Sequence, residues 1–323
     1  MPADKKSDEV VLLSGMALFT TLLLKLLPLY AVVLLGWFGG KYLAVKKESI
    51  ATLLIYIIAP VVVFRGVVTS EITLALLLLP VLFFLLACFF CLAFYLVGTF
   101  IWEGSEKNIL AFTAGTGNTG YFGIPVVVAL FGDQFLGVAV LVTLGFVLYE
   151  NSVGFFITAK GNHTVSEAVR KVLKLPALYA FLAALLLNFA NLQLSPIILN
   201  TASSFLGAYT VLGMMLIGFG LADVTRASLD YVFTGIAFLA KFIAWPLVVG
   251  ALIILDMAFF RFFDSTIHEI MLLTSITPLA SNTVAYATAL NTHPEKAALA
   301  VLLSTLFALI FIPLVATMVF PSV

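Results

Sequence analysis

The sequence predicts an all-α membrane protein with ten transmembrane helices, arranged as two inverted repeats of five helices. Three observations lead to this prediction: the composition, a series of long apolar segments, and a similarity between the two halves. Hydrophobic residues make up 63% of the 323-residue chain and charged residues 10%, whereas soluble domains carry about 25% charged residues. The formal net charge is zero, which gives no electrostatic reason to expect nucleic acid as a partner.

Ten segments each supply the roughly 20 apolar residues that a helix needs to cross a bilayer. They form a single transmembrane domain, with repeat 1 at about 15–160 and repeat 2 at about 174–321. A polar cytoplasmic link at about 161–173 joins the repeats, and the other connections are short. The predicted spans are 17–40, 48–69, 74–101, 109–132, 135–160, 174–193, 196–223, 228–258, 267–291 and 295–320.

The two halves share local sequence features. The stretch from Lys25 to Ala31 in the first span resembles the stretch from Lys174 to Ala180 in the sixth span. Pro80 in the third span corresponds to Pro246 in the eighth. Five spans per half is an odd number, so the second half must enter the membrane from the opposite side, which gives an inverted repeat.

The distribution of basic residues predicts the orientation. Most of the 16 Lys and Arg residues fall in loops on the side opposite the termini. Because cytoplasmic loops carry an excess of these residues, we expect both termini outside the cytoplasm. The protein is then a multi-pass protein of the cell (inner) membrane.

The fourth and ninth spans are interrupted by residues that break helices. The fourth contains the glycine-rich stretch from Gly115 to Gly120, followed by Pro125, and the ninth contains Pro278 and a Ser-Asn-Thr group. Glycine loosens a helix and proline removes a backbone donor. Freed backbone groups cannot face lipid, so such breaks face protein or a watery cavity.

Interrupted segments in corresponding positions of two halves indicate the substrate site of a secondary transporter. Two charged residues inside spans, Glu150 and Lys241, are further candidates, because buried ionisable groups in membranes are costly. They either pair with each other, or Lys241 meets an anionic substrate while Glu150, beside Asn151, holds a coupling ion or proton. The candidate substrate-binding residues are Gly117, Asn118, Thr119, Gly120, Pro125, Pro278, Ser281, Asn282, Thr283 and Lys241.

Other interpretations of these motifs are weaker. Gly115 to Gly120 fits a GxGxxG pattern, but a dinucleotide site needs a preceding strand and an acidic residue about 20 positions later. Small residues also allow close helix packing in membranes, which explains the glycines alone but not Asn118 with Pro125 and their counterparts in the ninth span. The histidines lack metal-ligand spacing, and no catalytic motif is present, so we expect neither an enzyme nor a metal site.

Two passages carry a family resemblance. The stretch from Gly117 to Pro125, followed by Ala129 to Gly132, resembles the fourth-span signature of the auxin efflux carrier family. The stretch from Ala297 to Leu314 is similar to that family's last span, and the short central link is typical of a bacterial-type member. The resemblance implies a fold shared with bile acid:sodium symporters and broken crossover helices 4 and 9. In that fold, spans 1, 2, 6 and 7 form a scaffold and the others a mobile core.

The resemblance also implies a homodimer and small carboxylates as substrates, such as malonate, malate or auxin-like acids. We therefore expect an organic-anion carrier that works by elevator-type alternating access, without a bound cofactor. Sodium or a proton is left open as the coupling ion. The alternatives are a sodium-coupled symporter of the bile acid type, in which Asn118, Asn282 and Glu150 help to hold the ion, and a membrane sensor that only binds its ligand.

Overall fold

The computed structural model is all-helical over the residues that it describes, with no strand among them. A helix satisfies all its backbone hydrogen bonds within one segment, which suits a chain this apolar. The predicted link at 161–173 lies almost wholly outside the described residues. The structure describes residues 3–43, 45–159, 166, 170, 173–174, 176–192, 194–222, 230–290 and 292–319.

Within this described part, seven helices are long and apolar enough to cross a membrane. This finding confirms a multi-pass α-helical membrane protein. The seven helical stretches are Phe19–Tyr42, Glu48–Val68, Leu78–Thr99, Asp133–Thr158, Pro196–Gly220, Tyr231–Phe260 and Pro294–Val319.

The three remaining predicted spans are shorter or interrupted helices. The sixth predicted span is α10 (Pro176–Phe189), which has 14 residues. The fourth is divided into α5 (Glu106–Gly115), a π-helical turn η2 (Thr119–Gly123) and α6 (Ile124–Phe131). The ninth is divided into α14 (Ser265–Ser275) and α15 (Asn282–Ala289). The count of ten spans and their inverted repeat therefore stay predictions.

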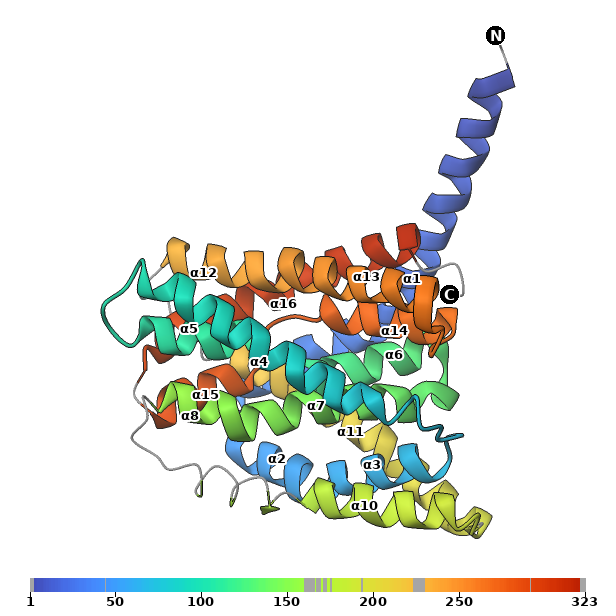
Figure 1. Ribbon diagram of the computed structural model, residues 1–323, viewed down its shortest axis with the longest axis horizontal. Coiled ribbons are helices and arrows are strands. Elements are labelled where there is room, and N and C mark those ends of the chain that lie inside the picture. Colours follow the sequence, from blue (N-terminus) through green and yellow to red (C-terminus); the bar gives the residue numbers. More distant parts are fainter. Residues whose placement is uncertain are drawn as a thin grey trace.

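The helices pack in two groups (Figure 1). In the first group, α2, α3 and α10 lie along the lower edge of the view, where α10 packs along α3. We assign α11 and α1 to this group because α11 packs on α3 and α1 packs along α11, although α1 also contacts α16. The second group holds the interrupted helices together with α4, α7, α12, α13 and α16. The remaining bounds are α1 (Ala3–Tyr42), α2 (Lys47–Leu53), α3 (Ala59–Val68), α4 (Leu78–Thr99), α7 (Leu136–Tyr149), α8 (Phe155–Thr158), α11 (Pro196–Ala222), α12 (Tyr231–Phe238), α13 (Trp245–Leu255) and α16 (Pro294–Val319).

Several helices contain a π-helical turn, a feature that is frequent at functional sites. Glu150 begins the turn η4 (Glu150–Gly154) between α7 and α8. Lys241 lies in the turn η5 (Leu239–Ala244) between α12 and α13. Both charged residues predicted inside spans thus lie at irregular points of otherwise continuous helices.

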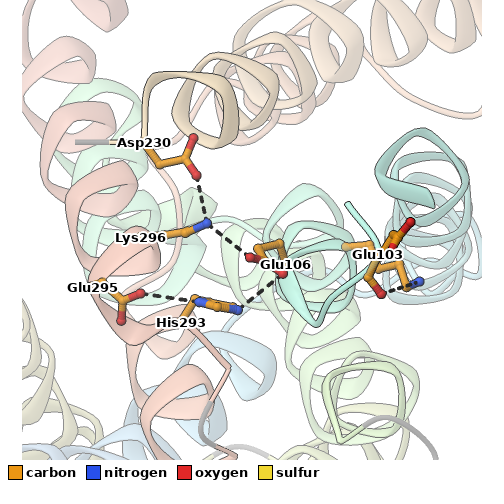
Figure 2. Close-up of polar contacts among 7 residues, drawn as sticks. Glu103, Glu106, Asp230, His293, Glu295 and Lys296 are labelled. Carbon is orange, nitrogen blue, oxygen red and sulfur yellow. Dashed lines mark hydrogen bonds and ion pairs between the residues drawn. The ribbon is translucent and has the colours of Figure 1, made fainter. Parts of the chain in front are cut away.

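At one end of the second group, a cluster of charged side chains ties together the starts of α5, α12 and α16 (Figure 2). We call Glu106, Asp230, His293, Glu295 and Lys296 the end network. Lys296 Nζ lies 2.9 Å from Asp230 Oδ2 and 3.4 Å from Glu106 Oε1. His293 lies within 3.4 Å of both Glu106 and Glu295. These contacts join three segments that are far apart in the sequence.

The end network shifts the titration of its carboxyl groups. Burial by itself would raise the pKa of Glu106, but its own backbone N–H, His293 and Lys296 outweigh burial. The pKa of Glu106 therefore lies below its ordinary value of 4.5. Asp230 behaves alike, because the Phe233 N–H and Lys296 outweigh burial and lower its pKa.

Candidate functional site

The two interrupted segments touch at their breaks. The backbone N–H of Asn118 donates a hydrogen bond to the carbonyl of Pro278, with an N···O distance of 2.7 Å. The Asn118 side-chain amide also lies 3.4 Å from the hydroxyl oxygen of Ser281. Residues about half a chain apart in the sequence therefore meet directly.

The chain leaves the helix at each break for local reasons. Helix α5 ends at Gly115, and Thr116 is extended, with φ −122° and ψ 173°. Helical bonding resumes where the Gly123 N–H donates to the Asn118 carbonyl at 2.9 Å, and Pro125 follows shortly after this π-helical turn, where it supplies no N–H to the helix. In the ninth predicted span, Pro278 lies between the end of α14 and the start of α15.

Side chains from neighbouring helices satisfy the backbone groups that the first break frees. The indole N–H of Trp245 donates to the carbonyl of Ala114 at 2.7 Å. The hydroxyl of Tyr149 lies 3.3 Å from the carbonyls of both Ala111 and Phe112. The last turn of α5 leaves carbonyls without helical partners, so these contacts allow the helix to end inside an apolar environment.

The second break is stabilised in the same way. The N–H of Leu279 donates to the hydroxyl of Ser304 on α16, at 3.1 Å. The Thr277 hydroxyl donates to the carbonyl of Thr274 in the last turn of α14, at 2.8 Å. Both breaks are therefore held open by specific hydrogen bonds.

Glu150 connects the two breaks. Its carboxylate accepts hydrogen bonds from the Thr116 hydroxyl at the first break and from the Asn282 amide at the start of α15, the latter at 2.7 Å. Its exposed fraction is 4%. The N-terminal end of a helix carries a partial positive charge, so α15 favours a carboxylate at this position.

Lys241 lies against the backbone of the first break. A Cβ atom added to Gly117 would lie 2.2 Å from Lys241 Nζ, so only glycine leaves room for the amino group. The side chain is fully buried, and Nζ lies 5.4 Å from the ring centre of Phe146 and 5.1 Å from that of Trp245. Ring faces of this kind attract a cation.

A cavity of about 330 Å³ opens at the breaks. Eight of the predicted site residues line it, whereas Pro125, Pro278, Thr283 and Lys241 do not. Pro278 acts through its carbonyl, and Lys241 lies behind Gly117. The eight residues are Gly117, Asn118, Thr119, Gly120, Glu150, Asn151, Ser281 and Asn282.

The other cavity-lining residues were not predicted from the sequence. Tyr56 lies in the π-helical turn between α2 and α3, Pro176 begins α10 and Tyr209 is on α11, so these three line the cavity from the side of the first group. Tyr286 lines the second group's side and donates to the Asn151 amide oxygen at 3.0 Å. Tyr is common at membrane–water interfaces and Pro is frequent in membrane helices, so the sequence carried no signal that placed these residues together.

A helical membrane protein with a cavity that carries polar side chains where two interrupted segments meet has the features of a membrane transporter. The comparisons agree. Residues 21–166 match the family described as membrane transport protein. An uncharacterized transporter from Methanocaldococcus jannaschii is 27% identical over 296 residues, which cover 88% of this chain and 94% of that relative.

These matches confirm the resemblance noted in the sequence. They support the assignment of the chain as a membrane transporter similar to the auxin efflux carrier family.

Proposed function

We propose that the protein is a secondary active carrier for a small organic anion, which binds in the cavity at the two breaks. One observation carries this proposal: the cavity lies where Asn118 meets Pro278, and its walls come from both groups of helices. Substrate sites of secondary transporters form in this way, at broken helices near the middle of the membrane.

The helix ends around the cavity favour an anion. The N-terminal ends of η2 and of α15 carry partial positive charge, which favours an anion. Asn118, Ser281 and Asn282 add side-chain groups that can donate hydrogen bonds to a carboxylate. The volume suits a small ligand, such as the malonate, malate or auxin-like acid that the family resemblance implies.

Glu150 places a carboxylate on the same cavity, so the charge of the site must be balanced. Lys241, close behind Gly117, supplies a positive charge that balances the Glu150 carboxylate and so allows an anionic substrate to bind. Glu150 and its neighbour Asn151 are the candidates for coupling transport to a proton. In the alternative, a sodium symporter, the oxygens of Asn118, Asn282 and Glu150 would hold the ion instead.

The cavity's position between the two helix groups supports an elevator mechanism. If α1, α2, α3, α10 and α11 stay fixed, sliding of the second group would carry the cavity across the membrane. Ten spans in an inverted repeat, with crossover helices 4 and 9, would allow this motion to be symmetric. We further propose a homodimer in the cell (inner) membrane, with both termini outside the cytoplasm and no catalytic activity.

The orientation has a direct test. A cysteine substituted for Ser7 should react with an impermeant thiol reagent applied to intact cells, because the N-terminus lies outside. A cysteine substituted for Glu106, in the end network, should react only after the cells are opened. Labelling of the Glu106 position in intact cells would contradict the proposed orientation.

The carrier function is tested by thermal-shift measurements with malonate, malate and indole acetate, followed by uptake into proteoliposomes. Asn118→Ala and Asn282→Ala should each lower substrate affinity about tenfold to a hundredfold, because a lost partner in a dry site costs about 1–3 kcal/mol. Gln134→Ala is the matched control, since its amide bonds to the Phe131 carbonyl outside the cavity. Unchanged affinity in both asparagine variants would place the site elsewhere, and binding without uptake would favour a sensor.

A further inference from the structure

The amino group of Lys241 has an unusual environment. Its side chain is fully buried, and Nζ has no hydrogen-bond partner among the residues that the structure describes. An ammonium group normally donates up to three hydrogen bonds. A buried charge without them is costly and in a membrane protein indicates a function.

The amino group lies near equivalent points of the two breaks. The Cβ position of Gly117 is 2.2 Å from Lys241 Nζ and 2.9 Å from the hydroxyl oxygen of Thr277. Gly117 comes two residues after the last residue of α5, and Thr277 comes two residues after the last residue of α14. The C-terminal ends of both helices therefore lie close to the region that Nζ occupies.

The C-terminal end of a helix carries a partial negative charge and favours a cation. Two such ends meet here, one from α5 and one from α14. In secondary transporters, the C-terminal ends of half-helices and the unwound carbonyls beside them bind the coupling cation. In this chain, a lysine amino group lies at that point.

We propose that the ammonium group of Lys241 is a tethered cation that takes the place of a bound sodium ion at the two breaks. The proposal rests on the proposed carrier function and specifies its coupling: this carrier requires no sodium at the site. Glu150 completes the arrangement, because its carboxylate lies at the start of α15, where the helix end has the opposite sign. The two buried charges thus each face helix ends of complementary sign.

The first test uses the purified full-length protein without substrate. Its thermal unfolding temperature is measured in NaCl, KCl and choline chloride at equal ionic strength. We expect the same value in all three salts, because the cation position is filled by the protein itself. A rise specific to sodium would overturn the proposal.

The second test removes the tethered group. Lys241→Ala should unfold at a lower temperature, and propylammonium or sodium ions, which can enter the vacated space, should restore several degrees. Lys296→Ala is the matched control: its partially exposed amino group serves the end network, so neither ion should restore its stability. A Lys241→Ala variant that responds to neither cation would overturn the proposal.

Where Lys241→Ala alone does not fold, the double variant Lys241→Ala, Glu150→Gln removes both buried charges and the helix ends remain. It should show the same response to propylammonium, and no response would overturn the proposal. Because substrate is absent throughout, these results are independent of the uptake assay. A failure here leaves the carrier function standing, and a failure in uptake does not alter the cation measurements.

Discussion

The end network and the meeting point of the two breaks each contain a buried or partly buried lysine, but the surroundings of the two amino groups differ. In the end network, Lys296 has two carboxylate partners within 3.4 Å, and its side chain is 16% exposed. At the breaks, Lys241 is fully buried and no hydrogen bond to its amino group is described. Figure 2 shows the first arrangement, in which short ion pairs join the starts of three helices.

This difference indicates that the charges of the end network have a structural role, whereas the charges at the breaks serve transport. Partly exposed ion pairs contribute little stability each, but a network fixes the relative positions of the elements that it joins. A buried charge without full hydrogen bonding costs stability, so its presence needs another explanation. We find that explanation in the helix ends at the breaks, which both Lys241 and Glu150 complement.

The largest expected effect comes from neutralising one charge at the breaks. Glu150→Gln should lower the free energy of unfolding by about 3–5 kcal/mol, because it leaves Lys241 without its compensating charge. The double variant Glu150→Gln, Lys241→Met should recover much of this loss. Denaturation of both variants, followed by circular dichroism, measures the difference.

A Glu150→Gln variant of normal stability would show that the two charges do not act as a static pair. Uptake then decides the role of Glu150. If transport by the variant no longer depends on the proton gradient, the carboxyl group couples transport to protons. If transport keeps that dependence, Glu150 has neither role.

The second prediction concerns the space that Lys241 needs. Gly117→Ala should destabilise the protein by about 1–3 kcal/mol, because the new methyl group would overlap Nζ. Gly250→Ala is the matched control: a Cβ there meets no atom within 4 Å, and alanine favours a helix. Combining Gly117→Ala with Lys241→Ala should cost less than the sum of the two single losses, and strict additivity would contradict the close contact.

The third prediction concerns the end of α5. Trp245→Phe should cost about 1–2 kcal/mol, because the buried carbonyl of Ala114 loses its hydrogen-bond donor while an aromatic ring remains. The comparison is Trp102→Phe, a tryptophan outside this contact. Equal stability of the two variants would show that the indole N–H does not hold the break.

The smallest expected effect is acid sensitivity of the end network. The folded-state pKa values of Glu106 and Asp230 are lowered, so their contribution to stability is present above the ordinary values of 4.5 and 3.8 and is lost as pH falls through the folded values. Lys296→Met should cost about 1 kcal/mol at neutral pH and flatten this loss. The unfolding temperature of both proteins, measured from neutral to acid pH, gives the loss at neutral pH and the acid dependence. An unchanged acid dependence in the variant would contradict the prediction.

Local features of the sequence determined which segments are apolar and where helices break. Long runs of Leu, Val and Phe predicted membrane spans, because each run is long and apolar enough to cross a bilayer as a helix. Gly117 and Pro278 predicted the two breaks, because glycine loosens a helix and proline lacks a backbone N–H at any position in a chain. Asn118 and Asn282 followed as candidates from their positions beside those breaks.

Only the tertiary structure decided which distant groups meet. The hydrogen bond from Asn118 to Pro278, the bridge that Glu150 makes between Thr116 and Asn282, and the place of Lys241 behind Gly117 depend on how helices pack. The end network of Glu106 and Lys296 was likewise absent from the sequence prediction. Burial, helix breaking and charge are properties of single residues and short windows, whereas a contact depends on the path of the whole chain between its partners.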